Sequence, residues 1–262
     1  MNLTNALFVP ADRPDRFDKA AASGADAAIL DLEDAVAPAS KSAARANLRR
    51  LGDTATIVRI NAIGTEWHDE DVASVEALRP DAVMIPKCEA GEEIEALLSR
   101  LSVPVIALVE TASGIAGVRA LARYAGIARL AFGSVDCCAD LDCAHTRDVL
   151  LPARSELVLS SRFAGLEAPL DGVTLDIADG SVALSDARYA RALGFGGKLA
   201  IHPGQIAALR EGFRPDDVEI DWARSVLDSG NGATALNGIM VDEPVRVRAR
   251  RILARVHDGK DI

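Results

Sequence analysis

The chain has 262 residues, enough for one large domain or two small ones, and 49% of them are hydrophobic and 26% charged. This balance is typical of a globular protein and excludes a disordered or fibrous chain. The net charge of −10, from 39 acidic and 29 basic residues, argues against nucleic-acid binding because phosphate backbones would be repelled.

Short apolar runs alternate with amphipathic stretches along most of the chain. The runs are nearly continuous in apolar residues, as in strands buried on both faces, and occupy Ala6–Pro10, Ala27–Leu32, Thr56–Ile60, Ala82–Pro86, Val105–Val109, Arg129–Gly133, Gly172–Ile177 and Lys198–Ile201. Helical patterns lie between them at Pro14–Ser23, Pro38–Leu51, His68–Leu78, Gly91–Leu101, Gly114–Tyr124, Leu150–Ala164 and Ser181–Leu193. Eight strands separated by helices predict a (β/α)8 TIM barrel over residues 1–212, rather than an open sheet, which would usually stop at five or six strands.

The last fifty residues have a different pattern. Pro215–Leu227 is predicted as a helix, residues 229–244 as a Gly-rich loop or hairpin, and Val245–His257 as a basic amphipathic helix. Because the barrel closes at its eighth strand, we expect residues 213–262 to form a C-terminal appendage of helices and a hairpin. This extension is expected to cover the barrel mouth or to reach a neighbouring subunit.

The remaining global features favour a cytoplasmic protein. No apolar run reaches the roughly 18 residues of a membrane helix, and the first residues lack the pattern of a signal peptide. The four cysteines are Cys88, Cys137, Cys138 and Cys143, and their spacing fits neither a disulfide framework nor a zinc motif. We expect reduced, mostly buried thiols, whose role the sequence leaves open.

Polar residues follow the predicted strands, at the end of a barrel where active sites form. The set comprises Asp12 and Arg13, Asp31 to Asp34, Arg59 and Asn61, Lys87, Glu110, Asp136, Asp176 and Asp179, and His202. Strand ends meet water, so some of these residues are expected to be ordinary surface groups. Asp31, Glu33 and Glu110 directly follow deeply apolar residues, where an unpaired carboxylate would be costly to bury.

Two of these carboxylates suggest a site for a hard cation. Glu110 and Asp136 follow neighbouring strands and could share Mg²⁺, which binds one or two protein carboxylates and completes an octahedron with water and substrate oxygens. Glu33 and Asp34 could then accept hydrogen bonds from metal-bound waters. Structural ion pairing of the same carboxylates is the alternative interpretation.

The basic and amide residues of the rim are candidate substrate ligands. Arg13 and Arg59 offer planar guanidinium groups for a carboxylate, and Asn61 and Lys87 complete the predicted substrate-binding set. Lys87 admits three interpretations: a charge for an anionic ligand, an amine for a Schiff base, or a partner for a rim carboxylate.

The order of motifs resembles a known family. The chain resembles the citrate lyase β-subunit-like family of the HpcH/HpaI aldolase/citrate lyase superfamily, which includes malyl-CoA and citramalyl-CoA lyases. The segments that carry this resemblance are LFVPADRPDRFDKAAASGADAAILDLEDAV, VRINAIGTEWHDEDV, MIPKCE, ALVETASGI, LAFGSVD, DGVTLDIAD, KLAIHPGQI and NGATALNGIMVDEP. Together they cover essentially the whole chain.

The resemblance implies a TIM barrel that assembles into homotrimers or hexamers, with Mg²⁺ on Glu110 and Asp136. It implies that Arg59 holds the carboxylate of an acid substrate. It further implies that Asp242 is supplied across the active site by the tail of an adjacent subunit. Because the enolate formed on cleavage needs a proton donor, Asp242 is the candidate acid/base. The chain departs from the family at Ser113, where the segment ETASG replaces the more usual ETARG.

The resemblance and the candidate site together predict a Mg²⁺-dependent carbon–carbon lyase. We expect reversible cleavage of a citryl-, malyl- or citramalyl-CoA type thioester to a 2-oxo acid and acetyl-CoA. One alternative is a class II aldolase that acts on 4-hydroxy-2-oxo acids without CoA. Another is a citrate lyase β subunit that is active only with an acyl carrier protein as partner.

Overall fold

The computed structural model describes residues 3–230, 232–236 and 238–257. The chain divides into two compact units, Met1–Arg210 and Glu211–Ile262. Residues 231 and 237 of the predicted Gly-rich segment, like residues 1–2 and 258–262, lie outside the described residues. Within the described ranges, no helix is long and apolar enough to cross a membrane.

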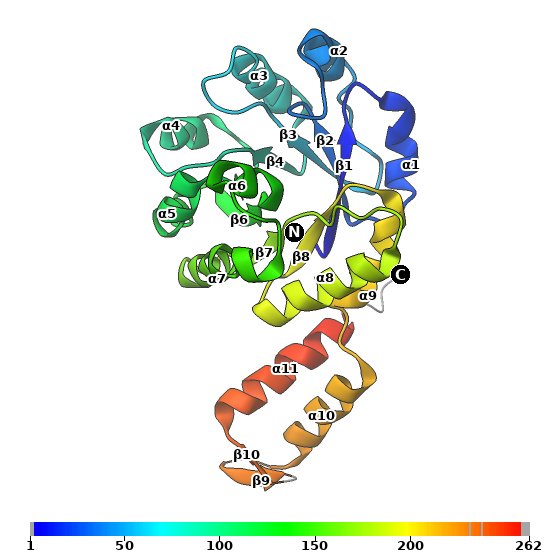
Figure 1. Cartoon of the computed structure of the whole chain (residues 1–262), viewed down its shortest axis with the longest axis vertical. Coiled ribbons are helices and arrows are strands. Elements are labelled where there is room, and N and C mark those ends of the chain that lie inside the picture. Colours follow the sequence, from blue (N-terminus) through cyan, green and yellow to red (C-terminus); the bar gives the residue numbers. More distant parts are fainter. Residues whose placement is uncertain (1–2, 231, 237, 258–262) are drawn as a thin grey trace. The chain divides into compact units, whose positions relative to one another are not determined.

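The first unit is a closed barrel of eight parallel strands, which confirms the predicted fold (Figure 1). Each strand pairs with the next along the chain, and the last pairs with the first. The strands are β1 Asn5–Pro10, β2 Ala27–Asp31, β3 Ala55–Arg59, β4 Ala82–Ile85, β5 Val105–Val109, β6 Ile127–Phe132, β7 Glu167–Asp171 and β8 Gly197–Ala200. All predicted strands except the seventh overlap an observed strand.

Helices connect the strands and surround the barrel (Figure 1). They are α1 Phe17–Ala21, α2 Lys41–Ala46, α3 His68–Leu78, α4 Glu92–Arg100, α5 Ala112–Leu121, α6 Ser134–Leu141, α7 Arg147–Phe163, α8 Gly180–Leu193 and α9 Ile206–Phe213. Short 3-10 turns, each beginning with a proline, precede α1, α2 and α9. Helix α6, which has eight residues and directly follows β6, was not predicted from the sequence.

The predicted position of the seventh strand is wrong. Gly172–Ile177 forms part of the loop after β7, and Leu175 and Ile177 are more than half exposed there. The true strand lies five residues earlier and was obscured by Glu167 and Pro169, which interrupt its apolar pattern. Directly after the strand, Gly172 passes too close to Ser134 for any side chain: a Cβ at Gly172 would lie 2.2 Å from the Ser134 Oγ.

Alternate residues of the strands fill the barrel interior, as the twofold period of a strand requires. This interior cluster contains Leu3, Ala6, Ala27, Ile29, Ile57, Ala82, Met84, Ile106, Leu108, Ala131, Leu170 and Leu199. Continuing the same alternation by two residues leads from Ile29 to Asp31, from Ile57 to Arg59 and from Leu108 to Glu110. The polar residues at the mouth are therefore the next layer of the inward-facing positions.

The second unit is a helical hairpin with a small sheet. Helices α10 (Asp217–Asp228) and α11 (Glu243–His257) pack together, and strands β9 (Thr234–Leu236) and β10 (Ile239–Val241) form an antiparallel pair between them in sequence. Its apolar core consists of Ala223, Val226, Val241, Ala249 and Ile252. The predicted helix–hairpin–helix order of the tail is thus observed.

Candidate active site

Arg59 lies at the end of β3 and is the most heavily paired side chain of the mouth. Its Nε and one terminal nitrogen donate to the two carboxylate oxygens of Asp31 at 2.7 and 2.6 Å, and its other terminal nitrogen lies 2.9 Å from Glu33. Asp31 and Arg59 are register partners on β2 and β3, which places this bidentate pair side by side. The guanidinium also lies over the Phe8 ring, 4.8 Å from its centroid.

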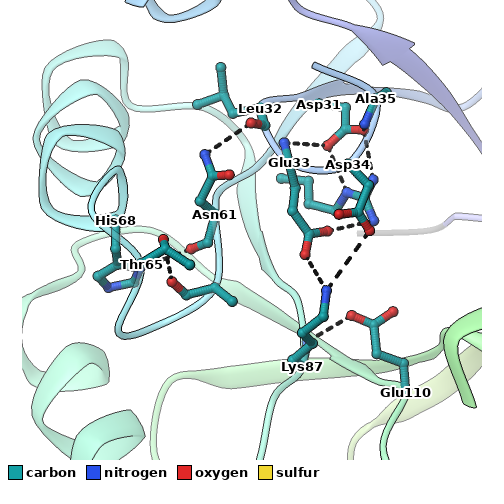
Figure 2. A network of polar contacts seen from close by, with 12 residues as sticks. Asp31, Leu32, Glu33, Asp34, Ala35, Asn61, Thr65, His68, Lys87 and Glu110 are labelled. Atoms are coloured by element: carbon teal, nitrogen blue, oxygen red, sulfur yellow. Dashed lines mark hydrogen bonds and ion pairs between the residues drawn. The ribbon is translucent and has the colours of Figure 1, made fainter. Parts of the chain in front are cut away.

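Lys87 links the β2 loop to the β5 end of the mouth (Figure 2). Its ammonium donates to Glu33 at 2.6 Å and lies 3.8 Å from Asp34, while its backbone N–H donates to Glu110 Oε1 at 2.8 Å. The residue adopts a left-handed φ of +46°, which is costly for a residue other than glycine. This backbone conformation presents the N–H to Glu110 while the side chain reaches Glu33.

Glu110 is a buried carboxylate in which only one of the two oxygens accepts a hydrogen bond from the described residues. Only 1% of the residue is exposed, and no donor among the described residues reaches its Oε2. Burial and the negative charges of Glu33 and Asp136 raise the pKa of Glu110 to about 8, although the Lys87 N–H and ammonium act in the opposite direction. The cations nearby are already committed, since Lys87 pairs with Glu33 and Arg59 with Asp31 and Glu33.

Gly133 provides the space that Glu110 occupies. A Cβ at this position would lie 2.1 Å from Glu110 Oε2 and 2.4 Å from its Cβ, distances that no real side chain could tolerate. Gly133 follows β6 at the inward-facing position two residues after Ala131, directly beside the β5 end because the two strands are paired. A glycine is therefore required for the Glu110 side chain to lie where it does.

Asp136 lies in the first turn of α6, three residues after Gly133, and is half-buried. Its negative charge contributes to the raised pKa of Glu110. Asp34 lies across the mouth near Lys87 with its side chain 60% exposed. Across the described ranges, no group of three or more His, Cys, Asp and Glu side chains is arranged to hold a metal ion.

These features fit a magnesium ion on Glu110 and Asp136. A buried carboxylate oxygen without a donor, beside further acidic groups, is an environment that a divalent cation stabilises. Two protein carboxylates with water and substrate oxygens in the remaining positions are typical of Mg²⁺, which does not need a third protein ligand.

Asn61 has its side chain fully engaged within the protein. Its amide nitrogen donates to the Leu32 carbonyl at 2.9 Å and to Asp71 at 2.6 Å, and its oxygen accepts from Lys41 Nζ at 2.7 Å. Lys41, itself 4% exposed, also donates to the Leu32 and Glu33 carbonyls at 2.6 and 2.8 Å. These contacts hold the loop after β2 in place, and they engage both the oxygen and the nitrogen of the Asn61 amide.

Two other candidates, Arg13 and Asp242, have local partners in the structure. Arg13 is exposed and pairs with Asp15 of its own 3-10 turn, at 2.9 Å. Asp242 lies in the second unit, directly before α11, where its Oδ1 accepts from the Val245 N–H at 3.3 Å. Arg13 is therefore not part of the network of Asp31, Glu33, Arg59, Lys87 and Glu110, and Asp242 is described within the second unit alone.

Three residues in or next to this network were not predicted as site residues: Asp31, which was expected only at the rim, Gly133 and Lys41. The signal for Asp31 and Gly133 was present, because both continue the inward alternation of their strands. Lys41 carried no such signal, since a lysine in a short amphipathic helix is normally a surface residue.

Comparisons with known proteins identify the family. The model of the HpcH/HpaI aldolase/citrate lyase family matches residues 5–203. The citrate lyase subunit beta-like protein of Mycobacterium tuberculosis is 41% identical over 275 residues, covering 99% of each chain. A (3S)-malyl-CoA thioesterase of Cereibacter sphaeroides is 31% identical over 96% of this chain and 93% of its own. The human mitochondrial citramalyl-CoA lyase is 30% identical over 93% of this chain and 82% of its own.

A solved structure agrees over the full length. The crystal structure of CitE from Mycobacterium tuberculosis in complex with magnesium, acetoacetate and coenzyme A has a TM-score of 0.88 and 39% identity, and the match covers 98% of both chains. The family match, the relatives and the barrel with its acidic mouth lead to one conclusion: the chain belongs to the HpcH/HpaI aldolase/citrate lyase family, a family of carbon–carbon lyases.

Proposed function

We propose that the protein is a Mg²⁺-dependent lyase that reversibly cleaves a 3-hydroxyacyl-CoA of the citryl, malyl or citramalyl type to a 2-oxo acid and acetyl-CoA. The observation that carries this proposal is the buried Glu110 carboxylate. Its Oε2 has no donor within the part of the chain that the structure describes, and the neighbouring Lys87 and Arg59 are paired with other carboxylates. Relatives whose names include citramalyl-CoA lyase, and a mycobacterial structure with magnesium and coenzyme A, support the substrate class.

Glu110 and Asp136 would hold the ion, and Glu33 and Asp34 would accept hydrogen bonds from its waters. When bound there, Mg²⁺ supplies a Lewis acid that polarises the hydroxyl and carboxylate oxygens of the substrate. Lys87 positions both Glu33 and Glu110, because its side-chain ammonium binds Glu33 and its backbone N–H binds Glu110.

Arg59 would orient the substrate carboxylate. A guanidinium has five N–H donors, and Asp31 uses two of them while Glu33 faces a third nitrogen, so N–H groups remain for a ligand at the mouth. Because Asp31 and Phe8 fix the plane of the guanidinium, the carboxylate would be bound in one orientation. The bond between C2 and C3 of the thioester would then be held in position for cleavage.

Cleavage moves one proton between two sites. The C3 hydroxyl loses its proton as the C2–C3 bond breaks and the 2-oxo acid forms, and the acetyl-CoA enolate gains a proton at its carbon. Asp242, delivered by the tail of a neighbouring subunit, is the proposed group that takes the first proton and returns it to the enolate. Substituting D242N should then lower kcat by about 100-fold or more while Mg²⁺ binding stays intact.

An assay of CoA thioesters with Mg²⁺ and with EDTA tests the function. We expect metal-dependent release of acetyl-CoA and a 2-oxo acid, and none from the E110Q variant. Full turnover in EDTA would overturn the proposal. Release of free CoA and a hydroxy acid would instead show thioester hydrolysis, which the relative named (3S)-malyl-CoA thioesterase makes the second candidate.

The same assay separates the two remaining alternatives. An aldolase would release pyruvate from a 4-hydroxy-2-oxo acid without CoA. A citrate lyase β subunit would be inert on CoA thioesters and active on the same acyl group carried by an acyl carrier protein. Either pattern would replace the substrate assignment but keep the metal site.

We also propose that the chain forms homotrimers or hexamers. Apolar side chains are exposed on α7 and in the loop after β7: Leu159 by 55%, Phe163 by 67%, Leu175 by 54% and Ile177 by 55%. Exposed apolar groups of this size support self-association. Light scattering on the purified protein should give three or six chains per particle, and a monomer would contradict the proposal.

A further inference from the structure

Three of the four cysteines lie on α6 and in the turn that follows it. Cys137 and Cys138 are buried in the helix, and Cys143 is half-buried in the turn. Asp142 ends the helix in the left-handed conformation with φ +50° and donates its N–H to the Cys138 carbonyl. The next N–H, that of Cys143, reaches the same carbonyl at 3.0 Å.

This closure brings two specific thiols together. A left-handed residue after a helix, followed by an N–H that bonds to the carbonyl five residues back, places the side chains of those two positions in contact. Here the two positions are Cys138 and Cys143. The backbone bond also keeps the two Cα atoms close, as a disulfide requires, with its span of about 4.4–6.8 Å.

We propose that Cys138 and Cys143 form a redox-active dithiol that a peroxide converts into an intrachain disulfide. Cys143, the more exposed thiol, attacks hydrogen peroxide, which gives a sulfenic acid and one water. The Cys138 thiol then attacks the sulfenic sulfur, the S–S bond forms, the S–O bond breaks and a second water leaves. Two electrons pass from the sulfurs to the peroxide, so two thiols and one peroxide become one disulfide and two waters.

The disulfide would restrain the helix that carries Asp136. The turn after α6 also contacts the start of the helix. His145 Nε2, from this turn, lies 2.9 Å from the Oγ of Ser134, which is the first residue of α6. A bond between Cys138 and Cys143 makes the contact at the C-terminal end covalent. Oxidation is therefore expected to slow amide hydrogen exchange in α6 and in residues 142–146.

The test uses the full-length reduced protein and hydrogen peroxide. After oxidation and blocking of free thiols, cleavage before aspartates separates residues 136–139 from residues 142–147, so a disulfide joins two peptides that mass spectrometry identifies. We expect this pair in the wild type, with loss of two mass units and reversal by dithiothreitol. C137S is the matched control and should retain the joined peptides, whereas C138S and C143S should lose them.

Several results would overturn the proposal. These are joined peptides that persist in C138S, a disulfide between chains, or over-oxidation of Cys143 to sulfinic acid without any cross-link. If C138S fails to fold, C143S and C137S still decide the outcome, because Cys143 is half-exposed and tolerates serine. The readout is covalent and does not depend on catalysis, so failure here would leave the proposed lyase function unaffected.

Discussion

Replacing Glu110 with glutamine should stabilise the metal-free protein, although it removes a residue of the site. In the native structure, burial and neighbouring charges raise the pKa of Glu110 to about 8 from an ordinary value of 4.5. Each pKa unit between these values corresponds to about 1.4 kcal/mol, so the ionised carboxylate lowers the stability of the folded protein by up to about 5 kcal/mol. Glutamine carries no charge, can accept the same Lys87 N–H and places an NH2 donor among acidic groups.

The pH dependence has a defined sign. Because the folded protein holds the proton more tightly than the unfolded chain, the contribution of this carboxyl is fully present below pH 4.5 and is lost as the pH rises towards 8. In EDTA, the free energy of unfolding of E110Q should therefore exceed that of the wild type only slightly near pH 4.5. The difference should reach its maximum, up to about 5 kcal/mol, above pH 8.

Urea unfolding followed by far-ultraviolet circular dichroism, in EDTA from pH 5 to pH 9, measures this difference. Added Mg²⁺ should stabilise the wild type and leave E110Q unchanged. The exposed Glu92 of α4 offers a matched control, since E92Q removes a charge without burial and should follow the wild type at every pH. If E110Q were less stable than the wild type in EDTA at pH 9, Glu110 would not be an uncompensated buried carboxylate.

Three further outcomes follow from the same geometry. The G133A substitution should weaken Mg²⁺ binding by at least about tenfold, because the new Cβ would lie 2.1 Å from Glu110 Oε2. The circular dichroism spectrum should stay unchanged. A calorimetric titration that finds native Mg²⁺ affinity would contradict this steric argument. In the wild type, Mg²⁺ affinity should rise with pH up to about 8 and then level off, since the ion displaces the Glu110 proton; a flat calorimetric profile from pH 6 to 9 would exclude this competition. The K198M substitution should lower the free energy of unfolding, measured in urea, by about 3–5 kcal/mol. It breaks a buried ion pair in which Lys198 lies 2.8 Å from Asp171. A loss below about 1 kcal/mol would show that Arg154, also 2.8 Å from Asp171, is a sufficient partner for this carboxylate.

The barrel and its family could be predicted from the amino-acid sequence because the controlling signals are local. Strands buried on both faces need continuous apolar runs, and eight such runs separated by helical patterns have few other solutions. The prediction failed where the local signal was misleading. Glu167 and Pro169 interrupt the apolar pattern of β7, so this strand was not predicted. The apolar Leu175 and Ile177, which were predicted as strand residues, lie in the exposed loop that follows.

The composition of the site was also largely visible, since polar residues that end apolar strands converge at one rim. The sequence predicted Arg59 and Glu110 there, and the inward alternation of the strands explains why both face the barrel axis. It did not show that Arg59 is already paired with Asp31, nor that Lys87 serves two carboxylates at once. Those contacts depend on strand register and on a left-handed backbone at Lys87.

The amino-acid sequence alone therefore determined the fold, the family and many of the charges at the mouth, because hydrophobic periodicity and strand ends are properties of short stretches of chain. Only the tertiary structure decided which of those charges are compensated. Pairing requires side chains from distant segments to come within about 3 Å, and that distance is set by packing around Gly133 and by the loop that Lys41 and Asn61 hold. The consequence is that Glu110 is left with an oxygen that no described residue satisfies.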